Sequence, residues 1–489
     1  MSNLNLNYKA IVKILGVIIL IEGIAMTIPW FYSSVTGDTG SSHAFAICTP
    51  VLIVIGGIFC IIVKQGKVRL RTREGYIVVA VCWMLASFIG AFPYYLTDFT
   101  DSFVDALFES TSGFTTTGCT SVPDAVLSPG LMLWKAISHW LGGMGILVFI
   151  ISILPALGIN GQLIVRAEAP GPVLEKVTVR MSDSAKILYL TYISFTVIEF
   201  LLLALPKKMS VFDAVITTLG SISTGGLVAH PEGIAYYNSV YVEIVISVFC
   251  ILASINFVLY HYLVTGKKKY FFKDVEFKSY IIIIAVAILL CTVGLAAGTN
   301  ISFFAALRES FFQVISMATT SGYTRTAYYL WPTVCQLILI LLMFIGGCAA
   351  STSGSIKVVR IIVMLKLIWR GGIKRIHPRS VVAVKLGKNA VSAPVVSLIT
   401  MFILTYMLIF LLSSFILSFQ GLDLESSITT ALAMLSNTGA GFGEPALCGN
   451  FSAFHPILKL YLSALMIVGR LELFPIIVLF TRNFWGRDR

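Results

Sequence analysis

A short polar segment that ends in glycine occurs four times in this chain of 489 residues, at 115–118, 223–226, 319–322 and 436–439. The glycines are 108, 96 and 117 residues apart, and a Ser or Thr always stands three positions before the glycine. Each segment follows one apolar stretch and precedes another. The register extends upstream, because polar residues stand thirteen positions before every glycine: Asp105, Asp213, Glu309 and Ser426. This shared register indicates one structural unit that is repeated four times.

The composition is that of a membrane protein. Hydrophobic residues make up 57% of the chain and charged residues only 12%, whereas a soluble domain carries roughly 25% charged residues. Ten apolar stretches approach or exceed the roughly 20 residues that a membrane-spanning helix needs. These predicted spans lie near 8–31, 44–63, 75–97, 131–155, 185–205, 238–263, 279–298, 332–369, 394–419 and 455–481.

Four segments between the spans are too short and too polar to cross a bilayer, and each leads into a glycine-ended segment: 102–115, 210–223, 304–319 and 424–436. We interpret them as re-entrant half-helices, since irregular backbone at membrane depth is tolerated only where it is buried or lines a water-filled cavity. The predicted fold is an all-α polytopic membrane protein with two extra N-terminal helices and four helix–pore-loop–helix repeats. The predicted divisions are 1–70 for the extra helices, and 71–160, 161–265, 266–375 and 376–489 for the repeats.

The four polar loops have the chemistry of an ion selectivity filter. Glycine lets the backbone turn so that carbonyl oxygens can face an axis and replace the hydration shell of an ion. Alternatively, the hydroxyl groups only cap the half-helices, but capping does not require a glycine at one fixed position in every repeat. We therefore predict a cation-conducting protein whose filter consists of Thr116, Thr117, Gly118, Thr224, Gly225, Gly226, Thr320, Ser321, Gly322, Asn437, Thr438 and Gly439.

The basic residues are concentrated in alternate connections between the spans. The segments 1–13, 64–73, 156–187, 264–278, 357–389 and 482–489 carry 28 of the 35 Lys and Arg residues. By the positive-inside rule these segments are cytoplasmic, as are both termini. An even number of spans agrees with that orientation. Glu22 interrupts the first apolar run, so we expect an uncleaved helix there rather than a signal peptide.

The eighth predicted span is interrupted by ten consecutive small residues. Glycine weakens a helix and serine competes for its backbone hydrogen bonds, so we expect an intramembrane loop here. A tight helix-packing patch of small residues is the alternative interpretation. The residues concerned are Gly346, Gly347, Cys348, Ala349, Ala350, Ser351, Thr352, Ser353, Gly354 and Ser355.

Other polar residues near the predicted spans have two interpretations each. Arg470 lies inside the last span, where it either pairs with a buried carboxylate or faces the conduction path as a barrier to cations. Lys357 is expected to snorkel to the cytoplasmic end of its helix. Cys119 follows the first filter glycine and is either an outer pore residue or an incidental small apolar one.

Acidic residues surround the first loop without a nearby Lys or Arg in the sequence. We expect them to raise the local cation concentration at an outer mouth. For Asp105 and Asp213, stabilisation of a half-helix N-terminus is an equal alternative. The residues around the first loop are Asp98, Asp101, Asp105, Glu109 and Asp124, and Glu425 and Glu444 flank the fourth.

Several motifs in fixed order resemble the TrkH/TrkG/KtrB superfamily of potassium transporters, on its TrkH-like branch. They are STSGFTTTG at 110–118, WLGGMG at 140–145, RAEAPGP at 166–172 and GGCA at 346–349. The resemblance implies a fourfold pseudo-symmetric K+ pore in one chain of a bacterial inner membrane, with K+ held at the filter residues. It also implies a homodimer, a cytoplasmic nucleotide-binding regulatory subunit of RCK type, a gate at residues 346–355 and an Arg470 that faces the pore.

The chain shows none of the sequence signals of an enzyme. It has no G-x4-G-K-[ST] phosphate loop, its six histidines are isolated, and its nine cysteines form neither a CxxC pair nor a disulfide framework. We expect a potassium uptake protein with K+ as the transported ion and no covalently bound cofactor. An ion-coupled (H+ or Na+) K+ symporter is the alternative, and inverted repeats would favour it.

The expected ion selectivity and partners follow from the loops and from the cytoplasmic charges. Each loop shares only one glycine, so we expect a short stack of binding sites and loose K+/Na+ discrimination. The basic cytoplasmic face contacts anionic membrane lipids, and we expect the regulatory subunit to dock there, with no nucleic acid partner. The basic residues of this face include Lys267, Lys268, Lys269, Lys366, Arg370, Lys374, Arg375, Arg379, Lys385 and Lys388.

Overall fold

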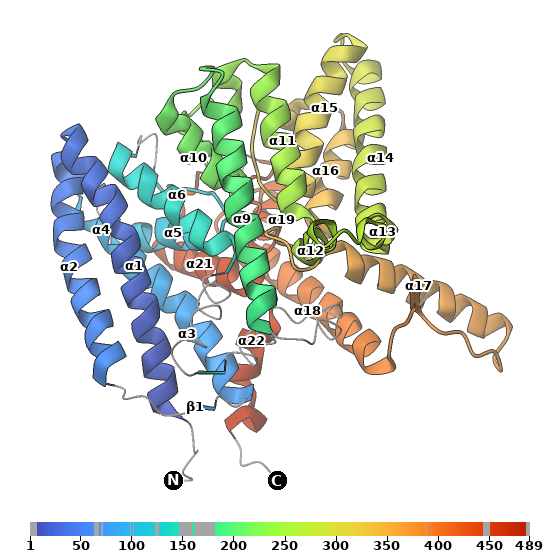
Figure 1. Cartoon of the computed structure of the whole chain (residues 1–489). Coiled ribbons are helices and arrows are strands. Elements are labelled where there is room, and N and C mark those ends of the chain that lie inside the picture. Colours follow the sequence, from blue (N-terminus) through green and yellow to red (C-terminus); the bar gives the residue numbers. More distant parts are fainter. Residues whose placement is uncertain are drawn as a thin grey trace.

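The computed structural model describes residues 7–62, 68–69, 72–97, 99–100, 102–122, 127–145, 159–160, 181–387, 389–443 and 450–485. The molecule is built almost entirely of helices (Figure 1). Its strands are the two-residue segments β1 (Val68–Arg69) and β2 (Ile159–Asn160), which pair in parallel, and β3 (Lys385–Leu386) and β4 (Asn389–Ala390), which pair antiparallel. The motif at 166–172 and the predicted span residues 146–155 lie outside the described residues.

Helices α1 (Tyr8–Thr36) and α2 (Thr39–Ile62) form an antiparallel pair at one side of the molecule (Figure 1). The pair depends on close approach of small residues. A Cβ added at Gly56 would lie 2.6 Å from the backbone nitrogen of Leu20, and one added at Gly16 would lie 2.6 Å from the Cβ of Phe59. Small residues at such contacts let two apolar helices pack tightly without a polar partner. The two extra N-terminal helices of the prediction are thus present as a packed unit.

The remaining helices form four units, each with a first span, a half-helix and a second helix. The first spans are α3 (Thr72–Gly90), continued by α4 (Phe92–Leu96), α9 (Met181–Ala204), α14 (Val275–Gly298) and α18 (Ala393–Ser418). The half-helices are α5 (Phe103–Phe114), α10 (Val211–Ile222), α15 (Phe303–Ala318) and α19 (Leu424–Leu435). The second helices are α6 (Pro129–Gly143), α11 (Val240–Ser254), α16 (Thr333–Ile345) and α21 (Pro456–Arg470).

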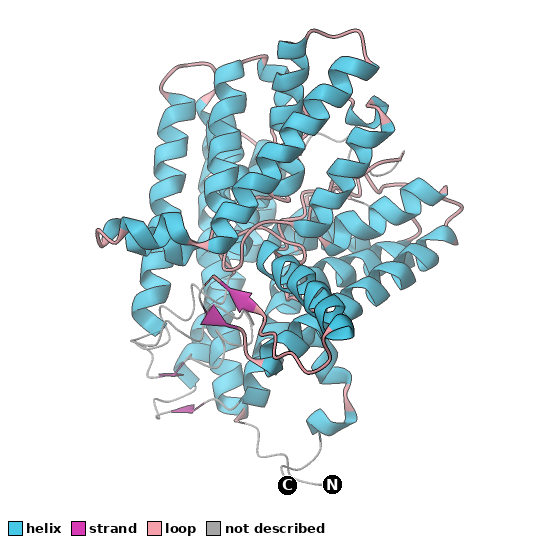
Figure 2. Cartoon of the chain, turned by 90° about the vertical axis from the view of Figure 1, so that its right-hand side faces the viewer, coloured by secondary structure: helices cyan, strands magenta, loops and turns pink. Residues whose placement is uncertain are grey.

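Packing between the units is cyclic. Each half-helix contacts both long helices of its own unit and the second helix of the preceding unit: α10 contacts α6, α15 contacts α11, and α19 contacts α16. Helix α5 of the first unit contacts α21 of the last. The series therefore closes on itself, and each half-helix is buried mainly toward its C-terminal end. Figure 2 shows the same helical bundle turned by 90°.

The second helices do not run straight across the molecule. Helix α11 is followed by α12 (Phe257–Val264) at an angle of 94°, and α21 by α22 (Phe474–Ile477) with its 3-10 extension at 113°. The spans predicted at 238–263 and 455–481 are therefore each broken into two helices. Asn256 starts the new helix by accepting a hydrogen bond from the Val258 nitrogen at 2.9 Å, and Leu473 turns the chain with a φ of 66°. Only the break after α16 was predicted.

Among the described residues, six helices are long and apolar enough to cross a membrane, and the two bent pairs raise the number to eight. Ten spans were predicted. The two that do not qualify contain α6, whose continuation lies outside the described residues, and α16, which ends at Ile345 where the small residues begin. Beyond that segment, α17 (Val358–Ile376) projects sideways from the bundle (Figure 1). The short α13 (Lys268–Lys273) packs against α14.

The first and last described segments reach the same end of the molecule. Helix α1 begins, and η5 (Arg482–Trp485) ends, at the bottom of the view in Figure 1. The loops that join the first spans to α10 and α15 lie at the opposite end (Figure 1). This arrangement agrees with an even number of membrane crossings.

Candidate functional site: four glycine-ended loops

Each half-helix begins at a side-chain cap. Ser102, Ser210 and Ser302 accept hydrogen bonds from the backbone nitrogens of Val104, Asp213 and Ala305, at 3.2, 3.0 and 3.3 Å. Asp423 does the same for the Ser426 nitrogen at 3.2 Å. A hydroxyl or carboxylate oxygen at this position satisfies a free N–H of the first turn. The polar residue before each apolar half-helix therefore fixes where that helix starts.

The four half-helices end in one and the same way. In each, the residue just before the glycine donates its N–H to the carbonyl five positions upstream, at 2.8–3.0 Å. The residue before that donates to the carbonyl three positions upstream. These two bonds define a Schellman motif, in which the residue at the turn is left-handed and usually glycine. The five-position donors are Thr117, Gly225, Ser321 and Thr438.

The turn position is not glycine in this chain. Thr116, Thr224, Thr320 and Asn437 occupy it with φ of 56°, 55°, 58° and 55°. Left-handed backbone costs a residue with a Cβ roughly 1–2 kcal/mol, although asparagine adopts it more readily than threonine. Strain of this kind persists only where the surrounding structure enforces it, and it clusters at functional sites. Its repetition at the same position in four loops marks them as the candidate site.

The glycines that end the loops pack against carbonyl oxygens of the neighbouring loop. A Cβ added at Gly118 would overlap the carbonyl oxygen of Gly225, and one added at Gly226 would overlap that of Ser321. Likewise, a Cβ at Gly322 would overlap the carbonyl oxygen of Thr438, and one at Gly439 would overlap that of Thr117. All four glycines have positive φ, between 69° and 82°. The loops thus form a closed ring whose contacts exclude any side chain at these positions.

The backbone oxygens of this ring lack a donor in the described part of the chain. No hydrogen bond there reaches the carbonyl oxygens of the twelve predicted filter residues, although their Thr, Ser and Asn side chains are buried. Backbone oxygens that are buried in a protein are normally paired. A closed ring of unpaired carbonyl oxygens is the ligand type that suits a dehydrated monovalent cation.

The fourth loop differs from the others in its side-chain contacts. The Asn437 amide donates to the Thr117 hydroxyl at 3.2 Å and to the Met466 carbonyl at 2.9 Å. It therefore ties the fourth loop to the first loop and to α21. Local sequence gives no sign of this bond, because its partners lie 320 and 29 residues away.

The small residues 346–355 lie directly against the ring. A Cβ added at Gly354 would overlap the carbonyl oxygen of Ser436, and the Gly354 nitrogen donates to the Thr320 hydroxyl at 2.8 Å. The segment is irregular, as predicted, with left-handed residues at Gly346, Ala350 and Ser355. It is also well hydrogen-bonded to its surroundings, since the Cys348 nitrogen donates to the Ser254 carbonyl at 2.9 Å.

Arg470 bridges this segment to the first repeat. Its guanidinium donates to the carbonyl oxygens of Thr352, Gly142 and Gly143 at 2.7, 2.6 and 2.6 Å. Glu472, two residues further along the chain, forms an ion pair with Arg360. Arg470 is therefore held by backbone oxygens of two other repeats at the level where α6 and α21 end.

Lys357 does not snorkel, and that prediction is wrong. Its side chain is only 5% exposed, and Nζ donates to the Ser353 carbonyl. The reason is that the irregular segment keeps the start of α17 next to the ring, where Glu276 accepts hydrogen bonds from the nitrogens of Ala349 and Val359 at 2.8 and 3.1 Å.

Two of the acidic residues around the first loop, Glu109 and Asp105, are ion-paired, which corrects the prediction that they act as free charges at a mouth. Glu109 contacts Lys135 at 2.7 Å with both side chains buried, and Asp105 contacts Lys459 at 2.6 Å. The lysines stand on α6 and α21, so their proximity is not visible in the sequence. Asp98, Asp101, Asp124 and Glu444 lie outside the described residues.

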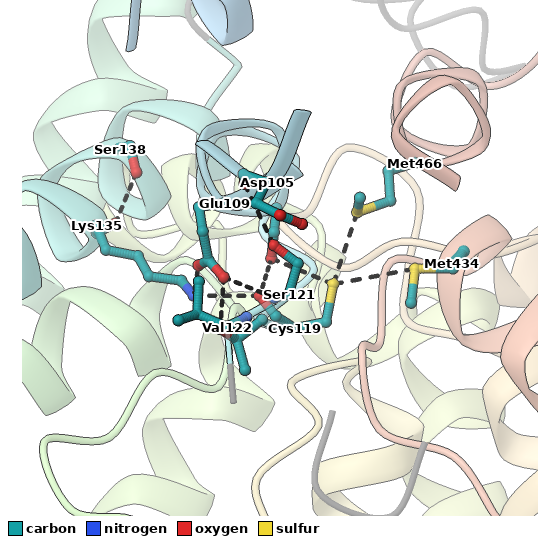
Figure 3. A network of polar contacts seen from close by, with 11 residues as sticks. Asp105, Glu109, Cys119, Ser121, Val122, Lys135, Ser138, Met434 and Met466 are labelled. Carbon is teal, nitrogen blue, oxygen red and sulfur yellow. Dashed lines mark hydrogen bonds and ion pairs between the residues drawn. The ribbon is translucent and has the colours of Figure 1, made fainter. Parts of the chain in front are cut away.

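The Glu109–Lys135 pair anchors the backbone that follows the first filter glycine (Figure 3). Glu109 accepts hydrogen bonds from the Ser121 nitrogen at 2.7 Å and from the Thr120 hydroxyl. Lys135 donates to the Cys119 carbonyl at 3.1 Å. Cys119 itself is fully buried, so it does not line an outer pore. This pair holds the end of the first loop in place.

Neutral residues make the equivalent bonds in the third loop. Gln313 and Ser316 donate to the Tyr323 carbonyl at 3.4 and 2.7 Å. They stand at the same distance before Gly322 as Glu109 and Ser112 before Gly118, and Ser112 donates to the Cys119 carbonyl at 2.8 Å. In both loops the carbonyl that follows the glycine is thus turned away from the ring and fixed.

Comparison with known proteins assigns this architecture. The family model described as TrkH, cation transport protein, matches residues 41–487. The Trk system potassium uptake protein TrkH of Salmonella typhimurium is 34% identical over 98% of this chain and all of its own length. The TrkG protein of Escherichia coli is 32% identical over 91% of this chain and 92% of its own.

A solved structure shares the fold. The crystal structure of the potassium transporter TrkH from Vibrio parahaemolyticus superimposes with a TM-score of 0.88 at 30% sequence identity. The match covers 98% of this chain and all of that one. The described helices and their bent pairs are therefore those of a known multi-span transport fold.

We predict that Lys135→Met destabilises the protein strongly, because it leaves Glu109 as a buried carboxylate without its cation. Breaking one side of a buried pair costs about 3–5 kcal/mol. The double variant Glu109→Gln with Lys135→Met should lose less stability than Lys135→Met alone, because no unpaired carboxylate is left buried. Thermal unfolding in detergent measures the effect, with Lys268→Met, the same change at an exposed site, as the control. Equal unfolding temperatures for Lys135→Met and Lys268→Met would contradict the anchoring role.

Proposed function

Because the chain belongs to the TrkH cation transport family, we propose that it carries K+ across the bacterial plasma membrane as the ion-conducting subunit of a Trk-type uptake system. The observation that carries this proposal is the closed ring of four loops, in which each glycine meets a carbonyl oxygen of the next loop. The family consists of transport proteins rather than enzymes, so the function rests on passage of an ion and not on a reaction.

We propose that the four repeats are related by fourfold pseudo-symmetry about one pore. The cyclic packing of half-helices on the preceding second helix supports this arrangement. The K+ ligands are then the backbone oxygens of the twelve filter residues at 116–118, 224–226, 320–322 and 437–439. Each loop supplies only a few layers of carbonyl oxygens along the pore axis. A filter this short is expected to select K+ over Na+ less strongly than a long filter does.

Conduction through a pore is favoured over ion-coupled symport. The four repeats share one orientation, because every loop follows a span that runs outward in the predicted topology, whereas symporter folds commonly carry inverted repeats. Discrete unitary currents from the purified protein in a bilayer would support the pore. Uptake that requires an H+ or Na+ gradient and shows no unitary currents would support the symporter.

The gate proposed for this pore is the segment 346–355 together with Arg470. Two observations support it: the segment touches the third and fourth loops through Gly354, and Arg470 holds it to the end of α6. A guanidinium at this place adds an electrostatic barrier to the steric one. A unit charge about 4 Å away contributes about 4 kcal/mol at an effective dielectric constant near 20.

The proposed assembly is a homodimer in contact with membrane lipids, with both termini and the basic connections in the cytoplasm. Helix α17 follows the gate segment directly and carries Lys366, Arg370, Lys374 and Arg375. A separate nucleotide-binding subunit of RCK type, docked on this cytoplasmic face, would act on the gate through α17. The chain itself offers no nucleotide-binding motif.

Gly322→Ser is predicted to change ion preference, because its side chain would overlap the Thr438 carbonyl and displace a ligand of the ring. The K+/Na+ permeability ratio of the parent protein, from reversal potentials in mixed solutions, should lie below about several hundred, and that of the variant should be lower still. Gly421→Ser is the matched control, since Gly421 also has positive φ but meets no atom within 4 Å. An unchanged ratio in Gly322→Ser, with intact folding, would contradict the filter.

Two different lesions of the gate should give one phenotype. Deletion of 346–355 removes the steric barrier, and Arg470→Ala removes the positive charge, so each should raise basal Rb+ uptake into proteoliposomes by about tenfold or more. Neither should alter the Rb+/Na+ preference, because the ring glycines are unchanged. Arg375→Ala, at an exposed site on α17, is the control. Should Arg470→Ala leave uptake unchanged, its role would be structural.

The regulatory subunit is tested by co-elution of the two purified proteins and by the effect of nucleotide on Rb+ uptake. A stable complex with nucleotide-dependent uptake is expected. Charge reversal of Arg370 and Lys374 together should weaken the complex, since both project from α17. No co-elution and no nucleotide effect would reject this partner.

A further inference from the structure

Three sulfur atoms meet behind the first filter loop. The Cys119 Sγ lies 3.9 Å from the Met434 Sδ and 3.8 Å from the Met466 Sδ. The three side chains come from the segment after Gly118, from α19 and from α21, and all are fully buried. Figure 3 shows both thioether sulfurs directed at the one thiol. The cluster therefore joins the first repeat to the fourth.

One thiol proton can bond to only one of its neighbours at a time. Cys119 has one S–H, while three acceptors lie within its reach: the two thioether sulfurs and the Ser112 hydroxyl at 3.4 Å. A cation at the centre of the sulfurs would contact the thiolate and both thioethers at once. Thioether and thiolate are soft ligands, of the type that binds Cu(I).

The spacing fits a single bound metal. A metal–sulfur distance of about 2.3 Å with ligands 120° apart places two sulfurs about 4.0 Å from each other. The observed sulfur–sulfur distances of 3.8 and 3.9 Å are about 0.1–0.2 Å shorter than this value. The two distances from the thiol to the thioethers are thus those expected in a trigonal site.

The charge balance also fits a monovalent ion. A thiolate with one monovalent cation is neutral, and the thioethers carry no charge, so the filled site places no net charge in a buried environment. The nearby Lys135 is already balanced by Glu109. Among the described residues, no group of three His, Cys, Asp or Glu could hold a metal, so the cluster lacks the ligands that a hard or borderline divalent ion requires.

We propose that Cys119, Met434 and Met466 form a binding site for one soft monovalent cation of the Cu(I) class. Binding exchanges the thiol proton for the metal: the S–H bond breaks, the metal–sulfur bond forms, and one proton leaves to solvent. The site is separate from the carbonyl ring and takes a different class of ion. It does not depend on the proposed K+ conduction.

The test uses the full-length protein in detergent under anaerobic, reducing conditions, with Cu(I) alone as the probe and a chromogenic chelator as competitor. A parent variant keeps Cys119 and replaces the other eight cysteines, at 48, 60, 82, 250, 291, 335, 348 and 448, by serine or alanine. One Cu(I) per chain is expected, and further replacement Cys119→Ser should abolish it. X-ray absorption should show about three sulfur ligands near 2.3 Å.

Replacement of the thioethers distinguishes a three-sulfur site from a lone thiol. Met434→Leu and Met466→Leu conserve volume and should each weaken Cu(I) binding by about tenfold or more and remove one sulfur ligand. Met343→Leu is the control, because Met343 is equally buried on α16. If all three substitutions leave affinity and coordination number unchanged, the sulfurs serve core packing only and the proposal is overturned.

A second comparison tests the proposal even if the cysteine-depleted parent does not fold. In the otherwise native protein, Cys119→Ser should lower the number of tightly bound Cu(I) ions by one. Cys48→Ser, which removes a buried thiol on α2, should not lower it. Equal copper content in the two variants would also overturn the proposal.

Discussion

The contact of each loop glycine with a carbonyl oxygen of the next loop is the constraint on which the rest of the structure depends. No side chain fits at Gly118, Gly226, Gly322 or Gly439, so the four loops must approach one another through bare backbone. The half-helices carry the loops to the centre of the bundle. They can enter its apolar interior because a helix forms the hydrogen bonds of its backbone internally. The cyclic packing of those half-helices then fixes the size of the ring.

The ring is held in place differently in each repeat, although its backbone is nearly the same in all four. The first loop uses the buried Glu109–Lys135 pair, and the third uses Gln313 and Ser316. In the second, the Leu227 carbonyl accepts a longer bond of 3.4 Å from the Tyr323 hydroxyl of the third repeat. One backbone geometry is thus supported by unrelated side chains, as expected when the function requires the backbone conformation alone.

Features set by local sequence could be predicted, and features set by tertiary contact could not. The half-helices, their loops and the break at 346–355 follow from glycine, hydroxyl and apolar patterns within short windows. The bend at Asn256 was missed because a single asparagine within an apolar run gives little signal. The Arg360–Glu472 pair joins residues 112 positions apart, and Lys357 is buried only because the irregular segment before it keeps α17 close to the ring. Sequence-based reasoning on charges therefore overestimated how many acidic residues stay free.

The hydrogen bonds of the segment 346–355 determine what any opening of the proposed gate must break. The segment is bonded to the second repeat through Ala253, to the third through Thr320, and to the first and fourth through Arg470. It therefore cannot leave its present position by a change in one repeat alone. Its C-terminal end continues into α17 without a flexible linker, because Lys357 and Glu276 fix the junction. A displacement of α17 must then strain the hydrogen bonds from the segment 346–355 to all four repeats. A force applied at the basic face would therefore act on all of these bonds at once.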